Sequence, residues 1–247
     1  SKNFNSLKDI ALAKSEIFTA VNSVETLIIN RNIKHFLSIK SLAKKKFIKN
    51  IITFGDEKNS DLYMIKKEIN KSEVIINAKL NGSNYISYKI NRNQEILEMS
   101  FLAMLGVLNT LNLNLNLIKK IKNLKLTEGR GQIKNISFNG KRLKILDHAY
   151  NASPVSMFAT IKLFSSMNKN NNIFVIGDMN ELGKQSSLYH KKVFKLALNQ
   201  TFDYCIFIGS KFYEFKKINK KENILFFYNV DYFINKIDSF IKKDCSI

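Results

Sequence analysis

The sequence predicts an α/β protein whose second half is a doubly wound domain built on a parallel sheet. After Gly131, short apolar runs alternate with segments of helical length and period, which is the order typical of parallel strands joined by crossover helices. The runs are almost continuously apolar, as expected for strands that are covered on both faces. Just before them, "LKLTEGRGQI" (124–133) breaks the pattern with two glycines around an arginine, which indicates a domain boundary.

The first half contains helices and strands without that regular alternation. Residues 7–21 and 95–111 have the length and apolar period of helices, and a basic helix is expected between the first two strands. The expected strands cover residues 25–30, 50–54, 73–78 and 85–90. We therefore expect a first domain at 1–126 and a hinge at 127–131.

The second domain, residues 132–247, has four expected strands that are each followed by a helix. The strands cover 141–147, 172–178, 203–209 and 223–228, and the helices cover 154–165, 186–198, 210–218 and 229–243. Ligands of open parallel sheets bind beyond the carboxyl ends of the strands. The residues that follow each strand are therefore the first candidates for a functional site.

Polar residues and glycines gather at these strand ends. Two strands end in Asp147 and Asp178, and we expect both at the same edge of the sheet. Ser153 can cap the helix that follows Asp147. Pro154, the one proline of the chain, then falls in the first turn of that helix, where a backbone N–H has no helical partner and its absence costs nothing. An ordinary, well-capped loop would have the same residues. In a chain with nine glycines, unusual backbone angles or close ligand approach are expected at Gly129, Gly131, Gly177, Gly183 and Gly209.

Lys14 lies within the first expected helix among apolar neighbours. The positions three and four residues away are Ile10, Ala11, Ile17 and Phe18. Such a lysine either extends to water or is partly desolvated, and a neutral amine can take up carbon dioxide to form an anionic carbamate. His35, His148 and His190 have no metal-ligand spacing, and each is interpreted as structural or exposed.

Composition excludes several classes of protein. The chain has 247 residues, of which 45% are hydrophobic, so it is globular. No apolar run reaches the roughly 18 residues of a membrane span, and no signal-peptide core is present, so a cytoplasmic location is expected. The net charge of +20 is spread over scattered lysines with no arginine-rich stripe. We therefore expect weak, nonspecific contact with nucleic acid and no specific nucleic-acid partner.

Four stretches, in this order, resemble the Mur ligases of peptidoglycan synthesis. They are "SLKDIALAKSEIF", "GRGQ", "ILDHAYNASPVSM" and "VIGDMNELGKQSSLYH". The last two are similar to the branch that joins D-alanyl-D-alanine to UDP-N-acetylmuramoyl-tripeptide. The resemblance covers almost the whole chain.

The resemblance implies a three-domain enzyme of which this chain is a part. It implies that residues 1–126 are the later part of the central ATPase domain, and that 132–247 form most of a Rossmann-like C-terminal ligase domain. The chain has no G-x-x-G-K-[ST] phosphate loop, so we expect it to be inactive alone. The usual adenine-contact pattern is not recognisable near residues 93–100, and the acidic residue usual after Asp147 is replaced by His148.

The resemblance also implies ligands and residue roles. ATP and Mg²⁺ would be cofactors, and UDP-N-acetylmuramoyl-tripeptide and D-alanyl-D-alanine would be substrates. Lys14, as a carbamate, would help to hold Mg²⁺, and Arg130 would reach the nucleotide phosphates. Asp147 would hold the ribose hydroxyls, with Tyr150 and Asn151 lining the nucleotide edge. On the amine-substrate side the implied residues are Asp178 and Glu181.

Two alternatives stay open. The chain could belong to another Mur-type ligase, such as the folylpolyglutamate synthetase branch. It could also be a basic binding protein that kept the fold and lost the activity. The "YNASP" and "DMNELG" segments favour the D-alanyl-D-alanine branch over the first alternative.

Overall fold

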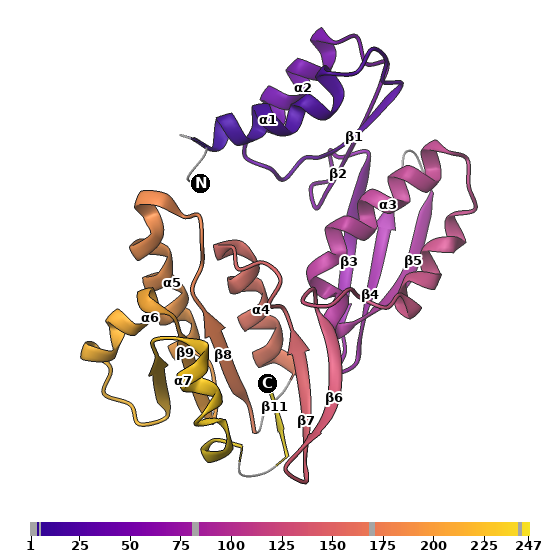
Figure 1. Ribbon diagram of the computed structural model, residues 1–247. Helices are drawn as coiled ribbons and strands as arrows, with labels where there is room; N and C mark the ends of the chain where they lie inside the picture. The colour runs from indigo at the N-terminus through magenta and orange to yellow at the C-terminus, as the bar shows by residue number, and fades with distance from the viewer. Residues whose placement is uncertain (1–3, 5, 81–83, 168–170, 242–243) are drawn as a thin grey trace. The chain divides into compact units, whose positions relative to one another are not determined.

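The computed structural model describes residues 4, 6–80, 84–167, 171–241 and 244–247. The chain divides into two compact units, Ser1–Leu124 and Lys125–Ile247 (Figure 1). The segment 127–131 therefore lies inside the second unit, and its role as a hinge stays a prediction. Each unit is described separately below.

The first unit carries a five-stranded mixed sheet. Its elements are α1 (Leu7–Thr19), β1 (Thr26–Asn30), α2 (Phe36–Lys45), β2 (Asn50–Gly55), β3 (Leu62–Ile69), β4 (Glu73–Lys79), β5 (Tyr85–Asn91), the 3₁₀ segment η1 (Arg92–Leu97), α3 (Glu98–Thr110) and η2 (Leu115–Asn123). The strands follow one another in the order β1-β2-β3-β4-β5. The first three are parallel, and β4 and β5 continue the sheet as antiparallel neighbours.

The two faces of this sheet are covered by different helices. Ile28 of β1 and Ile52 of β2 pack with α3 in the larger core, whereas the adjacent Leu27 and Ile51 pack with α1 and α2. Successive side chains of a strand point to opposite faces, which explains this division. The parallel strands β1 and β2 are therefore the central layer between two layers of helix.

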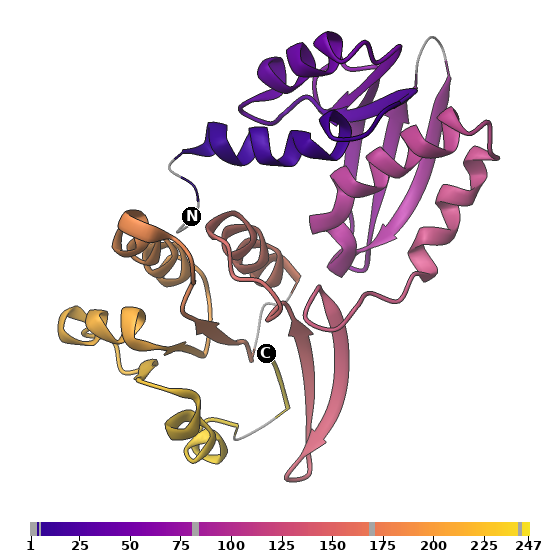
Figure 2. The same cartoon turned by 45° about the horizontal axis from the view of Figure 1, so that its top comes forward.

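The second unit holds the alternating strands and helices that the sequence predicts. Its elements are β6 (Gln132–Phe138), β7 (Lys141–Asp147), α4 (Pro154–Met167), β8 (Ile173–Gly177), η3 (Gly183–Gln185), α5 (Ser186–Leu198), β9 (Tyr204–Ile208), α6 (Ser210–Tyr213), η4 (Glu214–Ile218), β10 (Ile224–Phe227), α7 (Val230–Ile234), η5 (Ile237–Ser239) and β11 (Cys245–Ser246). Figure 2 shows α4 and α5 on the side of the strands opposite to α7.

The strands of this unit form two three-stranded ladders that meet at one bridge. β8, β9 and β10 pair in parallel, and β7 pairs in parallel with β11 on one side and antiparallel with β6 on the other. Among the described residues, a single parallel bridge from Asn172 to Ser246 connects the ladders. Thus β7, β8, β9 and β10 run in one direction, as predicted. β11 runs the same way and β6 is an antiparallel edge strand, and the sequence reading missed both.

Several predicted boundaries differ from the structure. β3 was not predicted, the helix expected at 95–111 begins as the 3₁₀ segment η1, and the helix expected at 229–243 is the short α7 followed by η5. The end of that expected helix, residues 242–243, lies outside the described residues. These differences leave the doubly wound α/β assignment of the second unit unchanged.

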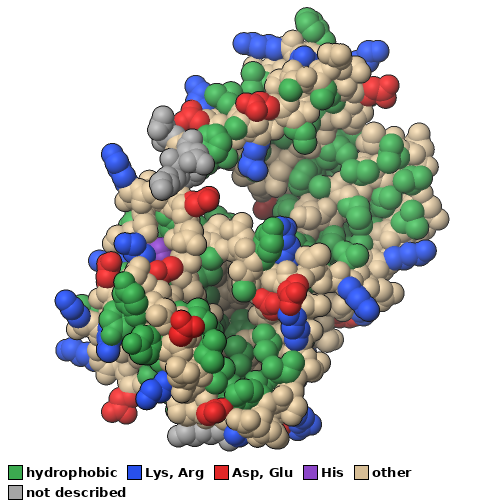
Figure 3. Space-filling view, viewed as in Figure 1, with side chains coloured by type: hydrophobic (Ala, Val, Ile, Leu, Met, Phe, Trp, Pro, Cys, Tyr) green, Lys and Arg blue, Asp and Glu red, His purple; other side chains and the backbone are tan. Residues whose placement is uncertain are grey.

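Charged side chains are spread over the visible surface of both units. Figure 3 shows Lys and Arg side chains scattered among acidic and apolar ones, with no continuous basic stripe on the face drawn. No helix in the described part of the chain is long and apolar enough to cross a membrane.

Candidate functional site

Asp147 and Asp178 lie at the same edge of the second unit, as predicted. Asp147 ends β7 and Asp178 follows β8, and the two strands run in the same direction on either side of β11. Both aspartates line one crevice with a volume of about 590 Å³. The carboxyl edge of the sheet therefore brings together the loops that the sequence singled out.

The Asp147 carboxylate ties two loops together. Its Oδ2 accepts a hydrogen bond from the Gly129 N–H at 3.2 Å and lies 3.3 Å from the Lys134 ammonium. Its Oδ1 accepts from the Ala149 N–H at 3.1 Å. Burial alone would raise the pKa of Asp147, but these three donors together hold it below its usual value of 3.8. The carboxylate is thus a fixed anion at the strand end.

The "GRGQ" segment is folded against the "YNASP" segment. Gly129 has φ +72°, and a Cβ there would lie 2.7 Å from the Tyr150 Cβ, so only glycine fits. The Gly129 carbonyl accepts from the Tyr150 N–H at 3.2 Å, and the Asp147 carbonyl accepts from the Gly131 N–H at 2.7 Å. Arg130 is exposed, and its guanidinium carbon lies 4.4 Å from the centre of the exposed Tyr150 ring. Arg130 is therefore carried on a hydrogen-bonded turn, with its exposed guanidinium against the face of Tyr150.

The loop between β7 and α4 ends in the predicted helix cap. Ser153 Oγ accepts from the Ser156 N–H at 3.2 Å, and the Ser156 hydroxyl accepts from the Ser153 N–H at 3.0 Å. Pro154 occupies the first position of α4, where its missing N–H has no helical partner to lose. The exposed Asn151 lines the crevice beside this cap.

Asp178 connects β8 to the start of α6. Its Oδ2 accepts from the Lys211 N–H at 2.9 Å and its Oδ1 accepts from the Phe212 N–H at 3.1 Å. Gly209 has φ +122°, and a Cβ there would lie 2.3 Å from the Asp178 carboxyl carbon. Both carboxylate oxygens therefore stabilise the 209–212 segment, which the sequence reading did not foresee.

His190 holds the segment after Asp178 in place. The imidazole is fully buried, accepts from the Met179 N–H at Nε2 (3.0 Å) and lies 2.8 Å from the Ser186 carbonyl at Nδ1. An acceptor at Nε2 and a donor at Nδ1 define a neutral ring, so its 3.7 Å approach to Asp178 is not an ion pair. The structural interpretation of this histidine is thus confirmed.

Glu181 and His148 differ in their surroundings. Glu181 is exposed, has a left-handed backbone with φ +61° and does not line the crevice. His148 does line it, and its buried Nε2 has no hydrogen-bond partner in the described part of the chain. Burial lowers the pKa of His148, and the neighbouring Asp147 carboxylate opposes that shift.

Lys14 does not have the apolar surroundings that the sequence predicts. It lies on the exposed side of α1, and Ile17 is 79% exposed. The helix buries Ala11, Ser15 and Phe18 instead. Of the two environments that the sequence left open, Lys14 therefore has the one in which its side chain extends to water, because its apolar neighbours lie on both the buried and the exposed sides of the helix.

The sequence reading missed a second polar strand edge, in the first unit. The parallel strands β1 and β2 end beside each other, followed by Arg31 and Asn32 and by Asp56 and Glu57. Arg31 Nε donates to Glu57 at 3.2 Å, and Asn32 donates to Asp56. The signal was the same as in the second unit, namely polar residues directly after parallel apolar strands.

The segment at the end of β5 and the start of η1, near the expected adenine-contact pattern, holds neighbouring backbone in place. Asn91 Nδ2 donates to the Lys122 carbonyl at 2.7 Å, and the buried Gln94 Nε2 donates to the Ile121 carbonyl at 2.8 Å. Both side chains hold η2 against the end of β5.

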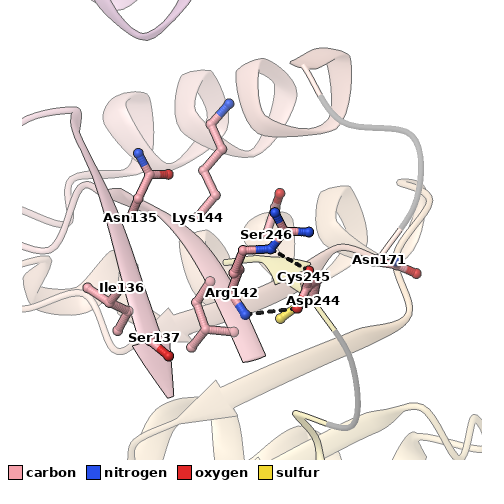
Figure 4. Close-up of a pocket in the computed structure, with 10 residues that line it drawn as sticks. Asn135, Ile136, Ser137, Arg142, Lys144, Asn171, Asp244, Cys245 and Ser246 are labelled. Atoms are coloured by element: carbon pink, nitrogen blue, oxygen red, sulfur yellow. Dashed lines mark hydrogen bonds and ion pairs between the residues drawn. The ribbon is translucent and has the colours of Figure 1, made fainter. Parts of the chain in front are cut away.

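A further open hollow of about 610 Å³ lies near the amino end of β7 (Figure 4). Arg142 Nε donates to Asp244 at 2.8 Å within it. None of the predicted site residues lines this hollow. Among the described residues, no group of three His, Cys, Asp or Glu side chains could hold a metal ion.

Comparisons with known proteins agree with the fold and the motifs. Residues 2–115 match the Mur ligase middle domain family. The chain is 27% identical over 236 residues to the UDP-N-acetylmuramoyl-tripeptide–D-alanyl-D-alanine ligase of Rickettsia prowazekii, covering 95% of this chain and 51% of that protein. It is 29% identical to the ligase of the same name from Buchnera aphidicola subsp. Baizongia pistaciae, covering 92% of this chain and 48% of the relative.

A solved structure has the same fold. The MurF ligase of Thermotoga maritima in complex with ADP superposes with a TM-score of 0.73 at 20% identity, covering 99% of this chain and 53% of that one. The chain thus spans about half the length of the curated relatives that it matches.

Proposed function

We propose that the chain belongs to the Mur ligases and forms part of an ATP-dependent ligase that joins D-alanyl-D-alanine to UDP-N-acetylmuramoyl-tripeptide, because residues 2–115 match the Mur ligase middle domain and the relatives align with almost the whole chain. The proposal takes the substrates from the names of the relatives and from the "YNASP" and "DMNELG" segments. These segments favour this reaction over that of a folylpolyglutamate-type ligase. Residues 1–126 would contribute to the ATPase domain and residues 132–247 to the ligase domain.

One observation carries the proposal: Asp147 fixes the turn that bears Arg130 to the loop that bears Tyr150 and Asn151. A carboxylate, a guanidinium and an aromatic ring are thereby held at one strand edge. Carboxylates accept hydrogen bonds from ribose hydroxyls, and arginine binds phosphate oxygens through charge-assisted contacts. This set is suited to an adenine nucleotide.

In the proposed reaction, the tripeptide carboxylate attacks the γ-phosphorus of ATP, the bond from that phosphorus to the bridging oxygen breaks, and ADP leaves as an acyl phosphate forms. The amine of D-alanyl-D-alanine then attacks the acyl carbon, and phosphate leaves with the electrons of the broken C–O bond. Arg130 would stabilise the negative charge that develops on the transferring phosphoryl group. The loop at Asp178 and Glu181 would lie on the amine side.

Mg²⁺ would supply charge neutralisation at the phosphates. The described residues do not fit a metal site by themselves, because no group of three potential ligands is present and Lys14 is exposed. A carbamate on Lys14 would need further metal ligands from outside the first unit to hold Mg²⁺.

The experiment compares two aspartates of the same sheet in a ligase that joins this chain to a phosphate-loop segment. Asp147→Ala is expected to raise the KM for ATP by about tenfold or more, because the nucleotide edge loses its fixed carboxylate. Asp244→Ala removes a carboxylate from the hollow at the other end of β7 and should leave the KM unchanged. Equal KM values for Asp147→Ala and the parent enzyme would contradict the proposal.

A further inference from the structure

The turn that follows α2 (Figure 1) holds an aromatic residue in a backbone conformation suited to glycine. Phe47 has φ +58°, and among the described residues the other non-glycine positions with positive φ are three asparagines and Glu181. A bulky side chain is disfavoured in this left-handed region, because its Cβ crowds the neighbouring carbonyl. Local backbone preference therefore does not explain a phenylalanine at this position.

The turn itself is a regular end for a helix. The Ile48 N–H donates to the Ala43 carbonyl at 3.2 Å, and the Phe47 N–H donates to the Lys44 carbonyl at 3.0 Å. This pair of bonds is the Schellman motif, in which the left-handed residue is usually glycine. Ile48 and Ala43 are buried in one cluster, which is the apolar contact that accompanies the motif. Glycine at position 47 would form the same turn with less strain, so the fold does not require phenylalanine.

The Phe47 side chain projects into solvent. It is 89% exposed, the largest exposed fraction of any large apolar side chain in the described part of the chain. A single exposed apolar residue is common at protein surfaces and by itself needs no explanation. Phe47, however, gains neither burial nor a favourable backbone from folding, and such a combination indicates a functional position.

Four exposed lysines flank this ring along the chain. They are Lys44, Lys45, Lys46 and Lys49. No ion pair joins any of them to an acidic side chain within the part of the chain that the structure describes. Residues 26–55 contain no aspartate or glutamate, and the nearest acidic residue along the chain before them is the exposed Glu25. The surface around Phe47 therefore has an uncompensated positive charge.

We propose that Phe47 and its four flanking lysines attach the first unit to an anionic phospholipid surface. The lysine ammonium groups contact lipid phosphates, and their aliphatic stems extend along the layer of head groups. The phenyl ring enters the boundary between head groups and acyl chains, where it is removed from water. Phe47 thereby gains in the bound state the burial that the folded chain does not give it.

The surroundings of Phe47 favour a lipid surface over a nucleic acid. Single strands are bound by several aromatic rings that stack on successive bases along a basic groove. Phe47 is the one exposed aromatic ring among residues 26–55, and it lines neither of the two hollows described above. A planar lipid surface needs no groove, and one apolar insertion beside a basic cluster suits it. The inference uses none of the residues of the proposed ligase reaction and stands apart from it.

The test follows the whole chain on lipid vesicles through a fluorophore at the proposed point of insertion. The chain has no tryptophan, so Phe47→Trp introduces a single indole. With vesicles of about one part phosphatidylglycerol to two parts phosphatidylcholine, its emission should shift to shorter wavelength, because indole enters the membrane interface. Vesicles of phosphatidylcholine alone, or anionic vesicles at about 1 M salt, should give no shift, because the charge attraction is absent or screened. Unchanged emission on anionic vesicles, or an equal shift with duplex DNA, would overturn the proposal.

Phe47→Gly separates attachment from folding. Glycine suits the left-handed turn, so the variant should be at least as stable in urea as the parent chain. Its partition coefficient on the anionic vesicles should fall by about tenfold or more, because no ring enters the interface. A folded Phe47→Gly chain that partitioned like the parent would show that the ring does not insert.

Two matched sets of lysines control for net charge. The first variant combines Lys44→Gln, Lys45→Gln, Lys46→Gln and Lys49→Gln. The second removes the same charge from exposed lysines of the second unit, through Lys216→Gln, Lys217→Gln, Lys220→Gln and Lys221→Gln. The first set should lower the partition coefficient by about tenfold or more, and the second by about twofold at most. Equal losses from the two sets would show that net charge alone binds the vesicles and would refute a site at Phe47.

Discussion

The carboxylate of Asp147 accepts the Gly129 N–H at 3.2 Å across a separation of 18 residues in the chain. This contact joins the turn that carries Arg130 to the strand end that begins the "HAYNASP" loop. Donors from Ala149 and Lys134 complete the set around the same carboxylate. Contacts within the chain itself therefore hold the candidate nucleotide edge together.

Asp147→Asn should lower the stability of the second unit in a pH-dependent way. The folded pKa of Asp147 lies below its usual value of 3.8, so its stabilisation is fully present above about pH 4 and is lost as the pH falls through the folded pKa. Hydrogen bonds to a charged group contribute about 1.5–3 kcal/mol, which sets the expected scale at pH 6. Urea unfolding of parent and variant between pH 6 and pH 3 measures this. If the difference in unfolding free energy between parent and variant stayed constant down to pH 3, the contacts assigned to the Asp147 carboxylate would be wrong.

Gly129→Ala should destabilise the chain more than Gly140→Ala. The two glycines have nearly the same left-handed φ, +72° and +74°, but a Cβ at Gly129 meets Tyr150 whereas nothing lies within 4 Å at Gly140. Placing alanine in a left-handed backbone costs about 1 kcal/mol at either position. The difference in unfolding free energy between the two variants therefore measures the steric contact between a Cβ at position 129 and Tyr150. Urea midpoints of the two variants provide the comparison, and equal midpoints would show that Gly129 and Tyr150 are not packed as described.

His190 should be found as the neutral Nδ1–H tautomer at neutral pH. Its Nε2 accepts from Met179 and its Nδ1 faces the Ser186 carbonyl, which leaves one assignment of the ring proton. Long-range ¹H–¹⁵N NMR correlations distinguish the two tautomers directly. His190→Phe should cost about 2–4 kcal/mol, because two buried backbone groups lose their partners. A protonated Nε2 would refute the arrangement.

Arg130→Ala should lower the rate of ADP formation by about tenfold or more in a ligase that contains this chain and a phosphate-loop segment. The physical reason is the loss of a charge-assisted contact to the transferring phosphoryl group. Lys134→Ala provides the control for lost positive charge nearby, since Lys134 is paired with Glu128 and Asp147. Its rate should fall less than that of Arg130→Ala, and the reverse order would remove Arg130 from the proposed role.

The sequence predicts the regular parts of the second unit well because its parallel strands are apolar on both faces. It failed at β6, where polar residues alternate along an edge strand, although Asn139-Gly140 was a direct hairpin signal with φ +49° and +74°. The sequence did not predict β3 because the consecutive charged residues Lys66, Lys67 and Glu68 interrupt its apolar pattern. These residues follow an irregularity in the pairing of β3 with β4.

The candidate site was predictable in place but not in detail. Strand direction alone located Asp147 and Asp178 at one edge. The sequence could not reveal that Asp178 would be used to hold α6, because its partners Lys211 and Phe212 are brought to it by the fold. The exposure of Lys14 was likewise not decided by the sequence, because helical spacing shows which residues are neighbours but not which of them are buried.

The central claim, that the carboxyl edge of the second unit receives the amine substrate of a ligase, is tested most directly by titrating the chain with D-alanyl-D-alanine. We predict that the NMR amide signals of Asp178 and Glu181 shift in a saturable way, and that L-alanyl-L-alanine at the same concentration leaves them in place. Equal shifts with both dipeptides, or no shift at this edge up to saturating ligand, would contradict the claim.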